Sequence, residues 1–312
     1  MAMPERGDHL SAAPPARAVE WARREAGADR VVSCRPLRGG ASHANHVLRL
    51  AAGDREFEVV LRRWARPGWA RDDPWFSASQ EAATYRLLAT APGVPAPALI
   101  GVDPDGSWCD VPAIAVTRAE GRRFSGAPNA AFVQGLASPL PALHAVDPAA
   151  ARAALPPYRP YHEESGLAPP AWSRRPGVWR RAIAIAAGPA PAEAAVFVHR
   201  DYHPGNTLWA GRRLSSVVDW TTASFGPPGI DLAHMRANLA MAYSLAMADS
   251  FLAAYAALVG RVSHDPYWDI RVAVDLLPDL LPEGLAAGAL ERLEDFVAEA
   301  VESRGPLPPD RR

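Results

Sequence analysis

The sequence predicts an α+β fold with two lobes, in which a small antiparallel β-rich part precedes a larger and mostly helical part. Short runs that are β-branched or alternate in polarity lie at residues 31–37, 45–50 and 57–61, and Gly-Gly and Gly-Asp turns separate them, which is typical of an antiparallel meander. Beyond Asp231 the apolar residues instead recur at steps of three and four, which is the period of a helix packed on one face. At 312 residues the chain is long enough for each part to bury its own core.

The composition excludes several classes of protein. The formal net charge of −1 gives no reason to expect a nucleic acid or a membrane surface as a partner, and nothing in the sequence indicates an obligate protein partner. Residues 1–18 contain no apolar core that could act as a signal peptide. The most apolar stretch, residues 239–248, falls well short of the roughly 20 residues that span a bilayer and predicts one buried helix. Cys34 and Cys109 lie far apart without metal-ligand spacing, which predicts reduced thiols in a cytoplasmic protein.

The β-rich part contains a turn that could approach a phosphate. The first turn of the meander holds Gly39 and Gly40, where a backbone without side chains could come close to a phosphate group, although the same pair also suits an ordinary hairpin. Residues 77–89 then predict a helix that begins at a Ser and is stopped by Pro-Gly. Residues 112–117 predict the last strand of this part.

The third strand of the meander ends in two cations, Arg62 and Arg63. All 33 basic residues of the chain are Arg, since the sequence contains no Lys, and a general compositional bias accounts for this. Alternation along the strand places Arg62 on the face opposite to Val59 and Leu61. An Arg presents a planar fork of donors instead of a point charge, so it would meet a phosphate with a different geometry from Lys.

The stretch at residues 196–231 organises the rest of the chain. Its apolar start suits a short buried strand, after which a polar loop presents Asp201 and, five residues later, Asn206. A second strand at residues 214–218 delivers Asp219 as the chain leaves it. Carboxylate and amide oxygens at neighbouring strand ends could hold Mg²⁺ on a polyphosphate while an Asp orients an attacking hydroxyl group.

These residues carry a resemblance. His199-Arg200-Asp201 with Asn206 and the later Asp219 resembles the catalytic loop and metal-binding turn of protein-kinase-like phosphotransferases. The wording DYHPGN, followed by VVDW and GIDLA, is similar specifically to the aminoglycoside phosphotransferase family, whose relatives include choline and homoserine kinases. The resemblance implies a protein-kinase-like fold with a nucleotide-binding lobe at residues 1–118 and a catalytic and substrate lobe at residues 119–312. It also implies ATP, with GTP as an alternative, and Mg²⁺ as cofactors.

The resemblance assigns a role to single residues. Asp201 would orient the acceptor hydroxyl group and accept its proton, while Asn206 and Asp219 would hold Mg²⁺. Arg62, favoured over Arg63 by the family's Val-Leu-Arg wording, would neutralise the nucleotide phosphates. The remaining expectations concern nucleotide binding by Gly39, Gly40, Ser42 and Glu81, the last as partner of Arg62, and support of the catalytic loop by His199 and Asp231.

The expected reaction is an ATP-dependent transfer of a phosphoryl group to a hydroxyl group of a small molecule. The expected acceptor is an aminoglycoside-type antibiotic or a similar amine-bearing metabolite. Phosphorylation of an antibiotic would confer antibiotic resistance. Between residues 262 and 300 nine acidic residues stand against two arginines, a balance that would suit a polycationic substrate or form an ordinary solvated face. Asp265 and Asp269 belong to this set as candidate substrate contacts. His203 is equally consistent with substrate contact and with packing.

Two alternatives stay open from the sequence. The first is another small-molecule kinase of the same fold, with choline, homoserine, a macrolide or a peptide antibiotic as acceptor. The second is a nucleotide-binding pseudokinase that works as an interaction module, which the missing strand Lys favours and the intact Asp201, Asn206 and Asp219 oppose. Protein substrates are not expected, because the interval between Asp219 and Asp231 is too short for an activation segment. Arg200 stands where most aminoglycoside phosphotransferases have Gly.

Overall fold

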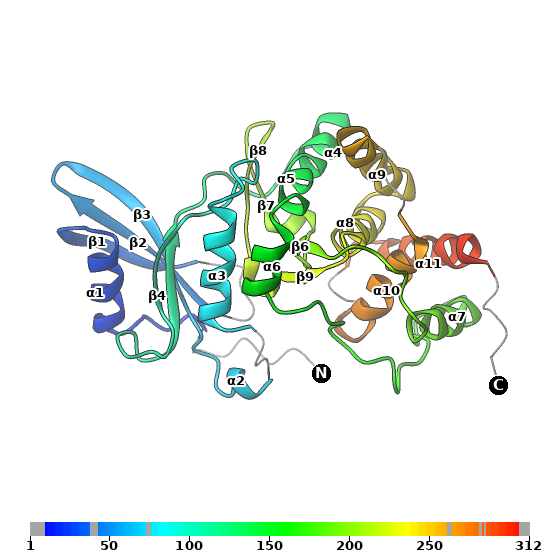
Figure 1. The fold of residues 1–312 in the computed structure, drawn as a ribbon, viewed down its shortest axis with the longest axis horizontal. Helices are drawn as coiled ribbons and strands as arrows, with labels where there is room; N and C mark the ends of the chain where they lie inside the picture. The colour runs from blue at the N-terminus through cyan, green and yellow to red at the C-terminus, as the bar shows by residue number, and fades with distance from the viewer. Residues whose placement is uncertain are drawn as a thin grey trace.

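A five-stranded antiparallel sheet and a helical body make up the chain, with one helix, α3, between them (Figure 1). The computed structural model describes residues 10–37, 43–72, 76–260, 264–280, 283 and 285–305. The predicted α+β class, with a small antiparallel part followed by a larger helical part, is confirmed.

The sheet has the strand order β1-β2-β3-β5-β4, and every neighbouring pair is antiparallel. Its strands are β1 (Arg30–Pro36), β2 (Ala44–Ala52), β3 (Arg55–Arg63), β4 (Leu99–Asp103) and β5 (Ala113–Thr117). The predicted meander corresponds to β1, β2 and β3, and the strand predicted at residues 112–117 is β5. No pattern in the sequence defined β4, which pairs with β5 at the edge of the sheet.

Alternation in β3 separates two cores. Val59 and Leu61 pack with α1 (Ala16–Glu25), where Trp21 is buried. Val60 faces the other way and packs against the large core that includes α3 (Ala78–Leu88). Because side chains two residues apart share one face of a strand, Arg62 points to the same side as Val60, toward α3 and the helical body.

The helical body is built around α8 (Gly229–Ala242), which packs against α9 (Leu245–Val259), α10 (Pro266–Leu276) and α11 (Ala289–Arg304). The shorter helices are α2 (Trp69–Asp72), α4 (Ala130–Ala137), α5 (Leu140–His144), α6 (Pro148–Ala154) and α7 (Pro176–Ala186), with 3₁₀ turns η2 (Pro204–Asn206), η3 (Trp220–Thr222) and η4 (Leu277–Asp279). Among the described residues, none of the helices combines the length and the apolar character that crossing a membrane requires.

The prediction of one continuous helix at residues 239–248 is wrong. The chain ends α8 at Ala242 and starts α9 at Leu245. The Ser244 hydroxyl accepts a hydrogen bond from the Met247 backbone N–H at 3.2 Å, so it caps α9. A Ser at this position satisfies the free N–H groups of a helix start, and apolar periodicity on both sides concealed the break.

Two small antiparallel pairs of strands flank the polar loops on the helical body. The strand β6 (Val196–Val198) pairs with β9 (Ser224–Gly226), and β7 (Thr207–Ala210) pairs with β8 (Arg213–Val217). The sequence predicted β6 and β8 but neither of their partners. The loop after β6 and the turn after β8 therefore start from anchored strand ends.

Candidate active site

A cavity of about 340 Å³ lies where β2 and β3 of the sheet face α8, α10 and the turn after β8. Its walls combine cationic, acidic and aromatic side chains from segments far apart in the sequence. The lining residues used below are His43, Asn45, Arg62, Trp64, Trp69, Phe76, Tyr161, Asp201, Asp219, Thr221, His234, Asp275, Leu276 and Asp279.

The loop that carries Asp201 is fixed by a buried carboxylate. Asp231, in the first turn of α8, accepts the backbone N–H of His199 at 3.0 Å and that of Arg200 at 2.8 Å. The His199 ring donates from Nε2 to the Val218 carbonyl at 3.1 Å, which ties the loop to the end of β8. Burial lowers the pKa of the His199 imidazole, so the ring is neutral and can make this bond without a charge.

Both oxygens of the Asp201 carboxylate have partners. Asn206 Nδ2 donates to Oδ2 at 2.9 Å, and His234 Nε2 lies 3.1 Å from Oδ1. His203 Nε2 is more distant, at 3.7 Å from Oδ2. Burial by itself raises the pKa of Asp201, but the hydrogen bonds and charge of His203 and His234 outweigh it and hold the pKa well below its usual value. Asp201 is therefore ionised at neutral pH.

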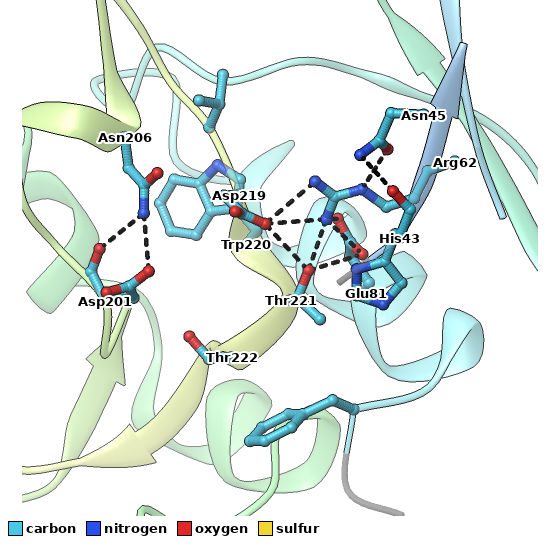
Figure 2. Close-up of polar contacts among 12 residues, drawn as sticks. His43, Asn45, Arg62, Glu81, Asp201, Asn206, Asp219, Trp220, Thr221 and Thr222 are labelled. Carbon is cyan, nitrogen blue, oxygen red and sulfur yellow. Dashed lines mark hydrogen bonds and ion pairs between the residues drawn. The ribbon is translucent and has the colours of Figure 1, made fainter. Parts of the chain in front are cut away.

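Asp219 meets Arg62 across the cavity. Its Oδ1 accepts from Arg62 Nη1 at 3.0 Å and from Nη2 at 3.1 Å. Arg62 Nη1 also donates to both carboxylate oxygens of Glu81 on α3, at 2.9 and 3.1 Å, and Arg62 Nε donates to Asn45 at 3.1 Å. Figure 2 shows Asp219 between the Asp201–Asn206 pair and the Arg62–Glu81 pair. The neighbouring Arg63 pairs with Asp110 instead.

The protonation states of Arg62, Glu81 and Asp219 depend on one another. Burial raises the pKa of Glu81, and Arg62 opposes that shift. Burial also raises the pKa of Asp219, but the Arg62 guanidinium outweighs it, so the pKa of Asp219 lies below its usual value. Burial disfavours the charge of Arg62, yet Glu81 and Asp219 raise the pKa of Arg62. The guanidinium therefore stays charged, with two carboxylates sharing it.

The donor set fits a magnesium ion. Asn206 uses its amide nitrogen for Asp201, so its amide oxygen is the atom left for a cation. Asp219 uses Oδ1 for Arg62 and Thr221, and its side chain is 45% exposed to the cavity, which leaves Oδ2 available. Among the described residues no group of three or more His, Cys, Asp and Glu side chains could hold a metal by itself. Mg²⁺ commonly takes one or two protein oxygens and completes its shell with phosphate oxygens and water, as would be required here.

Two expected substrate contacts lie elsewhere. Asp265 caps α10 by accepting the Tyr267 N–H at 2.9 Å, and it also pairs with Arg304. Asp269 is buried and pairs with Arg236 at 3.2 Å and with His264 at 2.8 Å. Neither lines the cavity, since their carboxylates hold the helical body together. The expected nucleotide-binding residues Gly39, Gly40 and Ser42 lie outside the described residues.

Several cavity residues were not identified from the sequence. His234 follows Asp231 by three residues, so both project from one side of α8 toward the Asp201 loop, a spacing that could have indicated it. Tyr161 comes from the Pro-rich segment between α6 and α7, where no periodicity exists to place a side chain. Its backbone N–H donates to Asp275 Oδ2 at 2.9 Å, which anchors this segment on α10.

The fold of this chain matches solved kinase-like enzymes. Macrolide 2'-phosphotransferase MphH from Brachybacterium faecium superimposes with a TM-score of 0.54 at 23% identity, covering 94% of this chain and 99% of that one. APH(2")-IIia in complex with GDP and kanamycin gives a TM-score of 0.60 at 16% identity, with 90% and 95% covered. A thermostable mutant of aminoglycoside phosphotransferase APH(4)-Ia, in a ternary complex with AMP-PNP and hygromycin B, gives 0.58 at 17% identity, with 92% and 99% covered. At these identities the likeness establishes the fold.

The sequence itself matches a family model. A comparison with curated proteins gives no significant match. Residues 33–271, more than half of the chain, match the model described as the phosphotransferase enzyme family, APH. This match and the kinase-like fold confirm the resemblance that the catalytic-loop wording indicates. The chain therefore belongs to the phosphotransferase enzyme family.

Proposed function

We propose that this protein transfers the terminal phosphoryl group of a nucleoside triphosphate, ATP with GTP as an alternative, to a hydroxyl group of a small molecule. One observation carries the proposal: Asp201, Asp219 and Arg62 line a single cavity between the sheet and the helical body. Solved proteins of the same fold hold AMP-PNP or GDP together with a small-molecule antibiotic, which supports both kinds of ligand.

Asp201 is the proposed catalytic residue. Its carboxylate is ionised and already oriented by Asn206 and His234, so it can accept a hydrogen bond from the acceptor hydroxyl group. Because the pKa of Asp201 is low, it is a weak base toward a free alcohol. It takes the proton once the new bond to phosphorus has made the hydroxyl group more acidic, so it contributes both orientation of the hydroxyl group and late proton acceptance.

The remaining residues act on the nucleotide. Asn206 and Asp219 would hold Mg²⁺, which supplies charge neutralisation on the phosphates when it is bound. Arg62 offers a charged fork to the phosphates, and Glu81 holds that fork in place from α3. Catalysis in this site rests on positioning and on electrostatic stabilisation of the transferring group.

The proposal extends to the organisation and setting of the enzyme. Residues 1–118 would form the nucleotide-binding lobe, and residues 119–312 the catalytic and substrate lobe. Cys34 and Cys109 are both free thiols, which supports a reducing, cytoplasmic setting. If the acceptor is an antibiotic, expression of the chain in a susceptible bacterium should raise the inhibitory concentration of that compound.

A coupled ADP- or GDP-release assay with a panel of hydroxyl acceptors tests the proposal. The panel contains kanamycin, hygromycin B, a macrolide, choline and homoserine, each with Mg²⁺ and ATP or GTP. We expect acceptor-dependent release of the nucleoside diphosphate, a phosphorylated product by mass spectrometry, and loss of both signals in Asp201→Asn. Nucleotide turnover that no acceptor stimulates would reject the transfer reaction.

The pair between Arg62 and Asp219 favours a second candidate. Since Arg62 already engages the proposed metal ligand at 3.0 Å, the chain could bind a nucleotide without turning it over and act as a regulatory pseudokinase. This candidate would be supported if calorimetry shows that the parent protein and Asp201→Asn bind the nucleotide equally well and if neither transfers a phosphoryl group to any acceptor of the panel. Product formation with any acceptor would exclude it.

A further inference from the structure

We propose that the acceptor is a bulky and mostly apolar molecule that carries a single amine. This inference rests on the proposed function and names the substrate class of the same site. It departs from the polycationic acceptor that the acidic composition of the C-terminal part would also suit. Three features support it: the apolar lining residues, the existing partners of the acidic lining residues, and the buried Arg200.

Part of the lining of the cavity is aromatic and aliphatic, and these lining residues are called the aromatic wall below. Trp69 of α2, Phe76, Tyr161 and Leu276 form it, from three segments far apart in the sequence. Burying an apolar surface against aromatic rings and a Leu side chain lowers the free energy of the complex. For a charged amine, these side chains offer mainly the faces of their rings. An acceptor with a large apolar body is therefore the complement of this wall.

The acidic residues of the cavity are mostly engaged already. Asp201 is held by Asn206 and His234, and Asp219 by Arg62, as described above. Asp275 accepts the backbone N–H of Tyr161 on one oxygen and that of His162 on the other, both at 2.9 Å. Asp275 Oδ1 also lies 3.4 Å from Arg271 Nη2.

Among the acidic lining residues that the structure describes, Asp279 is the one that remains for an amine. Its side chain is 52% exposed, and one of its oxygens lies 3.0 Å from His162 Nε2, which leaves the other oxygen free among the described partners. One available carboxylate matches one ammonium group. Further ammonium groups on the same acceptor would lose water beside the aromatic wall and gain at most a ring face instead of a carboxylate, which is less favourable.

Arg200 builds the aromatic wall from behind. Its guanidinium carbon lies 3.7 Å from the centroid of the Tyr161 ring and 5.1 Å from that of Phe76, a cation–π arrangement. Arg200 Nη2 also donates to the Arg159 carbonyl at 2.6 Å, and the residue is only 4% exposed. A positive charge directly behind the wall further opposes a polycationic acceptor.

The backbone conformation of Arg200 makes Arg200→Gly a suitable test of what its side chain does. The residue has a φ of 72°, in the left-handed region that favours glycine. An Arg there costs about 1 kcal/mol or more relative to a relaxed backbone, and its side chain contacts offset that cost. Arg200→Gly therefore relaxes the backbone and removes the contacts of the side chain with Tyr161 and Phe76 together with its hydrogen bond to the Arg159 carbonyl.

The test compares a macrolide that carries one amino sugar with kanamycin, each with Mg²⁺ and ATP or GTP. We measure kcat/KM, the phosphorylated product, and binding through the fluorescence of Trp64 and Trp69, which line the cavity. We expect the macrolide to be preferred by at least tenfold in kcat/KM. An equal or higher kcat/KM for kanamycin would overturn the acceptor class while leaving the transfer reaction intact. Macrolide binding without transfer to any acceptor would support the acceptor class and reject the reaction, and neither binding nor transfer would reject both.

Two variants probe the wall and the charge separately. Asp279→Asn should raise KM for the macrolide about tenfold through the lost ion pair and leave kcat unchanged, with no effect on a macrolide whose amine has been acetylated. Arg200→Gly should raise KM about tenfold for the macrolide and for its acetylated form, because both would use the aromatic wall, without changing KM for the nucleotide. The matched control is Arg24→Ala, whose guanidinium stacks over Trp108 at 5.1 Å on the far face of the sheet. An unchanged acceptor KM in both site variants, with melting temperatures like the parent protein, would remove the structural basis of the inference.

Discussion

Arg62 at the end of β3 and Asp219 after β8 form an ion pair across the junction of sheet and helical body, with Arg62 Nη1 at 3.0 Å from Asp219 Oδ1. The same Nη1 lies 2.9 Å from Glu81 Oε1 on α3. A cation proposed to meet the nucleotide phosphates thus also holds the carboxylate proposed to meet the metal ion. In the proposed reaction, a bound nucleotide with its metal would have to compete with Arg62 for Asp219, and the first two predictions follow from that.

Removal of the Arg62 side chain should destabilise the fold as well as weaken nucleotide binding. Arg62→Ala leaves Glu81, whose side chain is fully buried, without its charged partner, so the free energy of unfolding should fall by about 3 kcal/mol. The double variant Arg62→Met/Glu81→Gln should recover much of that loss because it removes both charges. Urea unfolding measures the stability, and Arg35→Ala is the control because its pair with Glu58 is exposed and should contribute below about 1 kcal/mol. A double variant no more stable than Arg62→Ala would contradict this reasoning.

Asp219→Asn should weaken binding of the metal–nucleotide complex about tenfold or more, since a neutral amide is a poorer ligand for Mg²⁺ than a carboxylate. Binding of the nucleotide without metal should change little, because Asn keeps an oxygen acceptor for Arg62. Calorimetric titrations with and without Mg²⁺ make this comparison. Asp147→Asn, which removes a carboxylate at the start of α6, is the control for a general effect of lost charge. Equal Mg²⁺ dependence in the parent protein and Asp219→Asn would rule out the metal role.

Asp201→Asn should lower kcat by roughly 100- to 10,000-fold, the range expected for a general base, while nucleotide affinity stays unchanged. The amide keeps the shape of the side chain but cannot accept the proton of the acceptor. Steady-state rates with the best acceptor of the panel, and nucleotide titrations, give the two quantities. Asp249→Asn on α9, where the side chain is 58% exposed, should keep the parent rate. A kcat within a few-fold of the parent value in Asp201→Asn would reject the assignment.

Asp231→Asn should lower both stability and turnover, because the Asp231 carboxylate accepts two backbone N–H groups of the catalytic loop. Hydrogen bonds to a buried charged acceptor contribute about 1.5–3 kcal/mol each, so we expect a loss of about 3 kcal/mol. The matched control is Asp103→Asn, since Asp103 is also buried and accepts the N–H groups of Trp108 and Cys109 at 2.9 and 2.7 Å, and it is not among the described residues that line the cavity. Both variants should lose stability in urea unfolding, but only Asp231→Asn should also lose kcat, by about tenfold or more. An equal kcat in the two variants would mean that Asp231 supports the fold without positioning Asp201.

The buried imidazole of His199 should make the fold sensitive to mild acid. Burial lowers the pKa of His199 below its ordinary value of 6.5. As the pH falls through 6.5 the unfolded chain takes up a proton on this ring and the folded chain does not, so the free energy of unfolding decreases below pH 6.5 and is at its full value above it. His199→Gln should reduce that loss between about pH 7 and pH 5, since Gln can donate to the Val218 carbonyl without titrating. Urea unfolding at several pH values gives the slopes, with the partly exposed His162→Gln as control. An unchanged slope in His199→Gln would contradict the prediction.

Local sequence was sufficient for the fold class and for part of the site. The alternation of side chains along β3 predicts that Arg62 and Arg63 point to opposite faces of the sheet. Their partners agree with this, since Arg63 pairs with Asp110 and Arg62 pairs with Glu81. The loop and turn that carry Asp201 and Asp219 were expected to converge at strand ends, and one cavity contains both. The sequence did not predict the strands β4, β7 and β9, because short edge and partner strands carry too few residues for a clear alternation.

Charge counts along the sequence did not show which carboxylates line the cavity. The acidic residues of the C-terminal part appeared as one set, yet Asp265 and Asp269 pair with Arg304 and Arg236 inside the helical body. Asp279 belongs to the same set and, among the described acidic lining residues, keeps an oxygen without a described partner in the cavity. Whether a carboxylate faces solvent, a buried cation or a ligand depends on packing between helices, which composition does not encode.

The sequence by itself determined the first three strands of the sheet, the loop that presents Asp201 and Asn206, and the cation at the end of β3, because each depends on neighbours within a few residues. The tertiary structure alone decided that Arg62 reaches Asp219, that His234 holds Asp201, and that Arg200 lies behind Tyr161. Those contacts join segments separated by up to 157 positions, and only the packing of sheet against helices brings such side chains within reach of one another.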